Sequence, residues 1–244
     1  MFSSTHSSSG VKRATARWAW APLAVAVGLT LSAAPAAHSA PRAEAQNCTI
    51  TGTPGDDNIN GTSGDDVICG LDGNDTITAR EGNDIVYAGA GNDNVVASLG
   101  NDTVYGGPGN DFLSGSIGND TLYGEAGDDR VDGSSDNDAI FGGDGNDDLG
   151  GSNGNDTIEG GDGNDFLGGS NDNDVLNGGD GNDTLDGSNG NDALNGGPGA
   201  DNLRGSNGDD NINAVDGSPN DSVNGGNNSD TCLVDPGDAV RSCP

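Results

Sequence analysis

An aliphatic side chain recurs at every ninth residue along most of the chain. With Gly52 as position 1, position 8 is Ile, Val or Leu in nineteen successive repeats, from Ile59 to Val223. Side chains alternate between the two faces of a β-strand, so position 8 would point into a core while positions 7 and 9 point outward. The pattern predicts one short strand at the end of each nonapeptide.

The nonapeptide register is nearly unbroken. Eighteen repeats follow one another without a gap over residues 52–213. A nineteenth repeat, residues 214–224, carries two extra residues, and a twentieth, residues 225–233, is degenerate. Such self-similarity at a short fixed period is typical of solenoids, in which each repeat packs only on its neighbours.

Glycine and aspartate fill the other half of each repeat. Position 1 is Gly or Ala throughout, and position 4 is Gly except at Asp136, Asp172 and Asn228. Glycine at both positions would allow positive φ angles or tight turns, and Asp and Asn tolerate the same backbone region. Position 5 is nearly always Asn or Asp, and position 6 is Asp in all twenty repeats. We therefore expect turns in this half.

A second period lies over the first. From the fifth repeat onward position 2 alternates between Gly and Ser, with Glu125 replacing one Gly. This 18-residue period indicates two nonapeptides per coil, with odd repeats on one side and even repeats on the other. Twenty repeats then give about ten coils.

At these positions the chain resembles a known repeat family. The nonapeptide GGDGNDTLD, residues 178–186, matches the pattern G-G-x-G-x-D-x-U-x of the hemolysin-type (repeats-in-toxin, RTX) calcium-binding proteins in full. The resemblance implies an all-β fold, a parallel β-roll (β-solenoid). It also implies that the first six residues of each repeat turn and bind Ca²⁺, and that the last three form a short strand.

The position-6 aspartates are the candidate metal ligands. Carboxylates and bare turn carbonyls form an all-oxygen ligand set on a flexible loop, which suits Ca²⁺ better than Mg²⁺, zinc or copper. If each ion bridges repeats n and n+2, twenty repeats offer at most about 18 sites. The candidate ligands are Asp57, Asp66, Asp75, Asp84, Asp93, Asp102, Asp111, Asp120, Asp129, Asp138, Asp147, Asp156, Asp165, Asp174, Asp183, Asp192, Asp201, Asp210 and Asp221.

The amino-acid composition argues against several classes of function for this protein. From Gln46 onward there are 39 acidic residues and four Arg, a net charge of −35, and no His, Lys, Trp or Met. That charge disfavours nucleic acid as a partner, and the missing residues exclude histidine-ligated zinc and catalysis by His or Lys in this part. One aliphatic residue per nine is a thin core, and the charge adds self-repulsion. We therefore expect the chain to be disordered without Ca²⁺ and to fold on binding it.

The N-terminus has the layout of a secretory signal peptide. Lys12, Arg13 and Arg17 precede an apolar run over residues 18–34, and small residues follow. A membrane anchor is the alternative. We assign residues 1–45 to the signal peptide and a short leader, with cleavage within 36–45. Residues 46–233 would form the calcium-binding roll and 234–244 a tail, leaving no membrane span after cleavage. The candidate cleavage points follow Ala36, Ser39 and Ala45.

Four cysteines in an exported chain favour two disulfides. Of the three connectivities, the two local bonds Cys48–Cys69 and Cys232–Cys243 are favoured; free or intermolecular thiols are the alternative. The first bond has a geometric difficulty, because Cys48 aligns with position 6 and Cys69 with position 9. Three residues of offset is about 10 Å along a strand, too far for a disulfide unless the first coil departs from the ideal path.

An aromatic strip is not required by the repeat. Tyr87, Tyr105, Tyr123 and Phe141 occupy position 9 of successive even repeats, while Glu159 and asparagines follow in the same column. In-register stacking that stabilises a thin sheet is one explanation. A contact surface for a protein partner or an extracellular polysaccharide is the other.

Together these features predict a secreted, non-enzymatic calcium-binding protein, extracellular or attached to the cell envelope. The alternative is an adhesive or matrix structural module that binds its partner through the aromatic strip. Carboxylate-pair hydrolysis is disfavoured, because the repeat accounts for every position-6 Asp.

Overall fold

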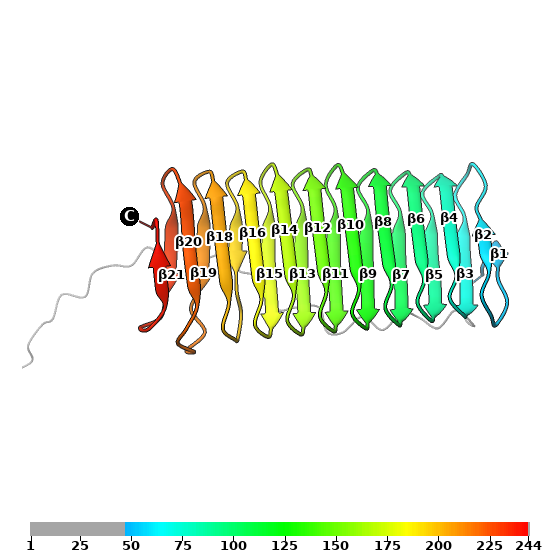
Figure 1. Cartoon of the computed structure of the whole chain (residues 1–244). Helices are drawn as coiled ribbons and strands as arrows, with labels where there is room; N and C mark the ends of the chain where they lie inside the picture. The colour runs from blue at the N-terminus through cyan, green and yellow to red at the C-terminus, as the bar shows by residue number, and fades with distance from the viewer. Residues whose placement is uncertain (1–46, 244) are drawn as a thin grey trace, which may run out of the picture. The chain divides into compact units, whose positions relative to one another are not determined.

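The computed structural model describes residues 47–243. These residues consist of strands and turns, with no helix among them (Figure 1). The signal peptide and leader predicted over residues 1–45, with their cleavage points, lie outside the described residues.

Twenty-two strands form two parallel sheets of eleven strands each. The odd-numbered sheet contains β1 (Ile50–Thr51), β3 (Val67–Asp72), β5 (Ile85–Ala90), β7 (Thr103–Pro108), β9 (Thr121–Ala126), β11 (Ala139–Asp144), β13 (Thr157–Asp162), β15 (Val175–Asp180), β17 (Ala193–Asn195), β19 (Asn211–Ala214) and β21 (Thr231–Val234). The even-numbered sheet contains β2 (Asn58–Asn60), β4 (Thr76–Glu81), β6 (Asn94–Leu99), β8 (Phe112–Ile117), β10 (Arg130–Ser135), β12 (Asp148–Asn153), β14 (Phe166–Asn171), β16 (Thr184–Asn189), β18 (Asn202–Asn207), β20 (Ser222–Asn227) and β22 (Ala239–Arg241).

Successive strands alternate between the two sheets, so each coil contains two nonapeptides. Neighbours within a sheet are 18 residues apart, as in the pairs Val131↔Leu149 and Ile140↔Ile158. The predicted β-solenoid with two repeats per coil is confirmed. It has about eleven coils rather than about ten, because the twenty repeats supply β2 to β21 and the flanking residues add β1 and β22.

The strands are longer than the repeat pattern implied. Most contain six residues, positions 7 to 9 of one repeat followed by positions 1 to 3 of the next. Positions 2 and 3 pair in register with the neighbouring coils, as in Ser134↔Ser152 and Ser135↔Asn153. The expected division into six turn residues and three strand residues is therefore wrong, because stacking against both neighbours extends the strand and leaves only positions 4 to 6 for the turn.

The core is a row of single aliphatic side chains between the sheets. Position 8 is buried in every repeat from Ile59 to Val223, as predicted. Position 1 also faces inward, where Ala79, Ala88 and Ala97 join the same apolar cluster. Every other described repeat except the nineteenth has Gly at position 1, so the core there is one side chain thick.

Positive φ angles occur at positions 2 and 4. At position 4, Asp136 (φ 75°), Asp172 (φ 72°) and Asn228 (φ 83°) replace Gly in the left-handed region, as the sequence predicted for Asp136 and Asp172. The expectation for position 1 was wrong, because none of its glycines has a positive φ. The serines of position 2 do, between 72° and 88°. Position 1 needs glycine for space instead, since a methyl group there would collide with the position-6 carboxylate of the same repeat.

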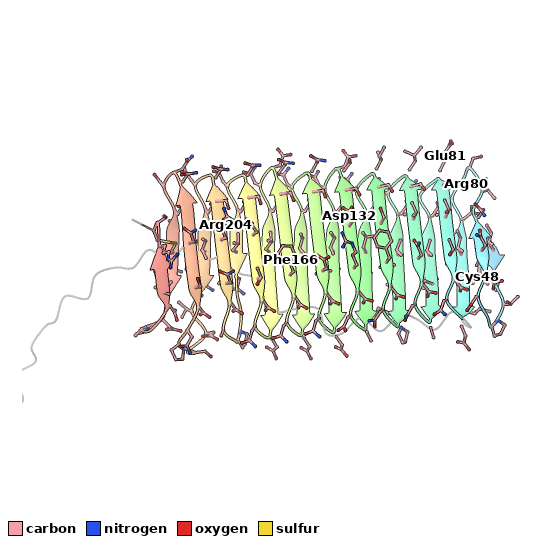
Figure 2. The ribbon with its side chains drawn as sticks, in the orientation of Figure 1. Cys48, Arg80, Glu81, Asp132, Phe166 and Arg204 are labelled. Carbon is pink, nitrogen blue, oxygen red and sulfur yellow. A yellow bond between two sulfur atoms is a disulfide. The ribbon has the colours of Figure 1, made fainter. Side chains whose placement is uncertain are left out.

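Disulfides lie at both ends of the roll. Cys48 and Cys69 are bonded with their Cα atoms 6.0 Å apart, and Cys232 and Cys243 with the same separation, so both favoured bonds are present. The sequence-based estimate of about 10 Å assumed that Cys48 lies in strand register with the next coil. Cys48 instead precedes β1, which starts at Ile50, so it is not held in that register and reaches Cys69. Figure 2 shows Cys48 at the β1 end of the roll.

The C-terminal bond closes the end of the core. Cys232 takes the inward position 8 and pairs in register with Ile212, and both Cys232 and Cys243 pack on the apolar cluster. Residues 234–244, predicted to be a tail, supply β22, which pairs with β20. The sheets therefore continue past residue 233.

We expect truncation of one core residue to weaken the whole roll. Leu149→Ala should lower the free energy of unfolding by about 2–5 kcal/mol, because the cavity lies in a core one side chain thick. Phe166→Ala removes an outward side chain that is 48% exposed and should lower it by less than about 1 kcal/mol. Urea titrations at saturating Ca²⁺ measure both, and equal losses would contradict the assigned core.

Candidate metal centres

The position-6 aspartates form two buried rows, one at each edge of the sheets where a turn leads into a strand. Their backbone is fixed there because the position-6 carbonyl accepts the position-7 N–H of the next coil, as between Asp129 and Asp148 (2.9 Å). From Asp66 to Asp230 every position-6 Asp is buried, with 7% exposure or less. Burial of so many carboxylates requires compensating contacts, because a buried charge without partners is strongly unfavourable.

One oxygen of each carboxylate is used to join coils. Oδ1 accepts the backbone N–H of the position-6 Asp one coil earlier, as from Asp129 to Asp147 and from Asp111 to Asp129, both at 2.8 Å. The same bond recurs along both rows and spans the insertion between Asp201 and Asp221. These bonds fix the direction in which each carboxylate points.

The other oxygen has no hydrogen-bond partner. Oδ2 is buried and unpartnered in eighteen aspartates. These are Asp75, Asp84, Asp93, Asp102, Asp111, Asp120, Asp129, Asp138, Asp147, Asp156, Asp165, Asp174, Asp183, Asp192, Asp201, Asp210, Asp221 and Asp230. Eighteen orphaned carboxylate oxygens in regular rows are the arrangement that bound cations would satisfy.

In the repeats from Gly106 to Gly205 the position-1 glycine packs closely against the orphaned oxygen. A methyl carbon placed on Gly124 would come within 3.0 Å of Asp129 Oδ2 and 2.6 Å from the carbonyl oxygen of Gly142 on the next coil. Gly142 repeats this geometry with Asp147 Oδ2 and the Gly160 carbonyl, also 2.6 Å away. Carboxylate and carbonyl oxygens from two coils therefore lie close to the same glycine. We call each orphaned Oδ2 atom, together with the backbone oxygens around it, a cradle.

The carbonyl oxygen of the next coil comes close to position 1 in both rows. It lies 2.6 Å from the methyl position beside Gly124 in an odd repeat and beside Gly205 in an even repeat.

The first two aspartates have different partners. Asp57 Oδ2 accepts the N–H and the hydroxyl of Thr53. Asp66 Oδ2 accepts those of Thr62, at 2.7 and 2.9 Å. Threonine at position 2 therefore occupies the oxygen that the later repeats leave orphaned, and these two predicted ligands lie outside the set of eighteen.

Two aspartates at the C-terminal end extend the rows beyond the predicted ligands. Asp230 Oδ2 is orphaned like the others. Asp238 accepts the N–H of Asp221 (3.3 Å) and stands directly before β22, at the place of position 6 in a further partial repeat. The sequence signal was available for Asp230, which keeps the register, but weak for Asp238, because Leu233 and Pro236 stand where the repeat has glycine at positions 1 and 4.

Burial raises the pKa of these carboxyl groups. Desolvation raises the pKa of Asp111 to about 7 and of Asp129 to about 8, and neighbouring carboxylates one coil away add to the effect. The pKa of Asp66 is lowered instead, mainly because the Thr62 N–H donates to it. A proton or a cation can each neutralise the raised groups, so a cation that binds at neutral pH would displace the proton of such a group.

Side chains alone do not complete a metal site. Within residues 47–243 no three Asp, Glu, His or Cys side chains form a cluster that could hold a metal ion. Any ion in a cradle therefore takes most of its ligands from backbone carbonyls, which favours a hard cation of flexible coordination such as Ca²⁺. No helix in the same part of the chain is long and apolar enough to cross a membrane.

The predicted aromatic strip is a continuous stack on the outer face of the odd-numbered sheet. Ring centroids are 5.0 Å apart between Tyr87 and Tyr105, 4.9 Å between Tyr105 and Tyr123, and 4.8 Å between Tyr123 and Phe141. The rings are nearly parallel, with interplanar angles of 4° to 9°. Each inner ring therefore has both faces covered by its neighbours.

The chain matches a model of a known protein family. The family model described as RTX calcium-binding nonapeptide repeat (4 copies) matches residues 49–77, 70–104, 87–122, 105–140, 114–149, 141–176, 150–185, 168–203 and 186–219. Together these stretches span residues 49–219 and include the aspartate rows from Asp57 to Asp210. A search of curated proteins gave no match.

We expect the calcium-free roll to be more stable in mild acid than at pH 8. An unfolded Asp ionises near pH 3.8, whereas the buried groups stay protonated up to about pH 6 to 8. Between these values only the unfolded chain loses protons, so the free energy of unfolding falls as pH rises through this window. Circular dichroism of dialysed, metal-free protein should show more β signal at pH 5 than at pH 8.

Saturating Ca²⁺ provides the control for this pH series. The bound cation would replace the proton, so the difference between pH 6 and pH 8 should largely disappear. A metal-free β signal that is constant or rises with pH would contradict the assigned electrostatics.

Proposed function

The chain belongs to the family of RTX calcium-binding nonapeptide repeat proteins, and we propose that it is a secreted protein whose β-roll folds as it binds Ca²⁺. The position-6 Asp side chains and the turn carbonyls would hold the ions between coils. The observation that carries the proposal is the set of eighteen buried, unpartnered Oδ2 atoms, each fixed in direction through the hydrogen bond of its Oδ1.

Charge balance supports many ions rather than a few. The segment from Gln46 onward has a net charge of −35, and eighteen divalent cations carry +36. Each ion would neutralise a carboxylate whose burial is unfavourable as an anion. It would also join two coils that otherwise repel each other. The number of orphaned oxygens equals the upper limit of about 18 sites obtained from the repeat count.

Folding would be coupled to binding. The core contributes one aliphatic residue per repeat in most coils, which is little apolar burial for nine ordered residues. Without ions the aspartate rows would add both repulsion and desolvation. We therefore propose a disordered chain at low Ca²⁺ and a rolled chain at extracellular Ca²⁺, with affinities on the order of 10⁻⁴–10⁻³ M.

An extracellular location is consistent with the disulfides and with weak calcium binding. Two disulfides close the ends of the roll, and such bonds persist in oxidising compartments. Signal-peptide features in residues 1–45 support export, and extracellular Ca²⁺ concentrations match a weak site. We propose a binding and structural role with no catalytic step, because the position-6 carboxylates from Asp75 to Asp230 are buried and accept hydrogen bonds between coils.

Removing the charge of two cradles tests the ligand assignment. The double variant Asp147→Asn and Asp165→Asn changes two neighbouring odd repeats. Each asparagine keeps an Oδ1 atom that can accept the backbone N–H of the earlier coil, but the anionic oxygen is lost. We expect at least one ion fewer per chain by equilibrium dialysis, and a higher Ca²⁺ concentration at the midpoint of the circular dichroism transition.

Asp148→Asn is the matched control, because Asp148 lies on the outer face and pairs with exposed Arg130 at 3.1 Å. It should leave both the ion count and the midpoint unchanged. An unchanged ion count in the double variant would contradict the assignment, and no circular dichroism change between chelator and Ca²⁺ in the wild-type protein would refute coupled folding.

A second candidate function uses the aromatic strip of Tyr87, Tyr105, Tyr123 and Phe141. An extracellular adhesive or matrix module would offer this strip to a polysaccharide or a protein partner. The specific observation is that four aromatic side chains gather on one half of one sheet, while Asn177 and Asn195 occupy the same column further on. The covered faces of the inner rings limit any contact to ring edges and hydroxyls.

Replacing Tyr105 and Tyr123 with Asn separates the two roles of the strip. If stacking is its role, the variant should lose about 0.5–1.5 kcal/mol of stability for each disrupted pair, measured by urea titration at saturating Ca²⁺. If binding is its role, sedimentation with cell-wall polysaccharide should be lost while Ca²⁺-induced folding is retained. Asn177→Ser in the same column is the control for both measurements.

A further inference from the structure

The strands of the two sheets differ in charge. Those of the even-numbered sheet contain all four Arg of residues 47–243 and four acidic residues, so their charges cancel. These are Arg80, Arg130, Arg204 and Arg241 against Glu81, Asp132, Asp148 and Asp186. The strands of the odd-numbered sheet contain six acidic residues and no basic one. The even-numbered sheet therefore presents a face of no net charge on a strongly acidic protein.

Two neighbouring strands of this sheet have no side chain at the outward position 9. Gly150 on β12 pairs in register with Gly168 on β14. Asp132 and Asp186 occupy the same column on β10 and β16, the strands on either side. A methyl group added to Gly150 would meet no heavy atom within 4 Å beyond its chain neighbours. The two glycines thus leave a bare stretch of sheet between two carboxylates, which we call the glycine gap.

Phe166 stands at the edge of the glycine gap. Its Cε1 atom lies 3.8 Å from the place of a methyl group on Gly168, and the residue is 48% exposed. Within residues 47–243 its ring stacks on no other ring, whereas Tyr105 and Tyr123 have both faces covered. Phe166, labelled in Figure 2, is therefore an aromatic ring that is open to a ligand.

Polar groups surround the glycine gap. Asp132 Oδ1 accepts the hydroxyl of Ser152 at 3.2 Å, and Asp186 Oδ1 accepts that of Ser206 at the same distance. Both carboxylates are therefore held in place. Further along the same strands runs a row of exposed amides, in which Asn171 donates to Asn153 (3.1 Å). Carboxylates, hydroxyls and amides can all pair with the hydroxyl groups of a ligand.

We propose that the glycine gap of the even-numbered sheet binds a neutral polysaccharide. The C–H face of a sugar ring would pack on Phe166 above the bare backbone of Gly150, and sugar hydroxyls would pair with Asp132 and Asp186. The balanced charge of these strands complements an uncharged ligand, whereas the net charge of the protein repels an anionic polymer. The strands repeat every 4.8 Å or about that, so successive sugar units would meet the same rows of serine and asparagine.

This surface lies on the opposite sheet from the aromatic strip and goes beyond the calcium sites. It requires only that the chain is rolled up. An open ring face, a bare floor and polar groups on both sides occur together here, whereas the covered rings of the strip offer only edges and hydroxyls.

Sedimentation with insoluble polysaccharide at saturating Ca²⁺ tests the proposal. The probes are cellulose, chitin and β-1,3-glucan, with phosphocellulose as the anionic comparison. Wild type should sediment with at least one neutral probe and not with phosphocellulose. Phe166→Ala removes the ring and Gly150→Val fills the gap, and each should weaken binding at least about tenfold. Gly150 has no positive φ and its methyl position is open, so valine is compatible with the strand.

Phe112→Ala is the matched control. Phe112 has the same strand position on β8 and is 37% exposed, but Ser114 takes the place of the glycine beside it. This variant should bind like wild type, and circular dichroism at saturating Ca²⁺ shows whether each variant is rolled up.

Four results would overturn the proposal. They are a rolled wild type that sediments with no neutral probe, one that sediments equally with phosphocellulose, unchanged binding by Phe166→Ala, and loss of binding only in the double variant Tyr105→Asn and Tyr123→Asn. A dimer of wild type in sedimentation velocity that Phe166→Ala dissociates would assign this face to a second copy and also overturn it. Failure of the proposed function is a separate result, since the circular dichroism of wild type would then not respond to Ca²⁺.

Discussion

The fold depends on the surroundings of one carboxylate oxygen per repeat, the Oδ2 atom of the position-6 aspartate. From Asp75 to Asp230 each position-6 Asp is buried where a turn enters a strand, and its Oδ1 atom joins two coils through a backbone N–H. Its Oδ2 atom is enclosed with no protein donor in eighteen repeats. A buried carboxylate in this state is strongly unfavourable as an anion, and a proton or a cation at each site would neutralise it. The regular spacing of the sites follows from the regular spacing of the coils.

Two ladders of polar side chains run along each edge of the roll, in opposite directions. In the buried ladder the backbone N–H of position 6 donates to the Asp of the next coil, as Asp129 does to Asp147. In the exposed ladder the N–H of position 5 donates to the Asn or Asp of the previous coil, as Asn92 does to Asn74. Asparagine is sufficient at position 5, where water solvates the side chain. Aspartate at position 6 instead has a second oxygen that is buried and has no hydrogen-bond partner from Asp75 to Asp230.

The ends and the middle of the roll are stabilised by different contacts. At the N-terminal end Thr53 and Thr62 donate to the first two aspartates, so no orphaned oxygen is left there. At the C-terminal end Asp238 continues the ladder into β22, and the Cys232–Cys243 bond covers the core. Between them, alanine methyl groups and stacked tyrosines supply apolar contacts in the first third. Side-chain donors at the N-terminal end, apolar packing in the first third and a disulfide at the C-terminal end thus add to the hydrogen bonds between coils.

The sequence by itself determined the repeat, the inward row at position 8, the two-repeat coil and the aspartate rows. These features depend on local periodicity, and a nine-residue period with alternating position 2 leaves little freedom in how coils stack. The sequence also identified Asp136 and Asp172 as replacements for glycine, because that choice depends on the φ angle of one residue.

Only the tertiary structure decided what depends on contacts between coils. It made the strands six residues long, assigned glycine at position 1 to space rather than to φ, and showed that threonine satisfies Asp57 and Asp66. It also allowed Cys48 to reach Cys69 by leaving the register before β1. Each of these outcomes depends on atoms a whole coil away or on the path of a chain end, and a repeat pattern contains neither.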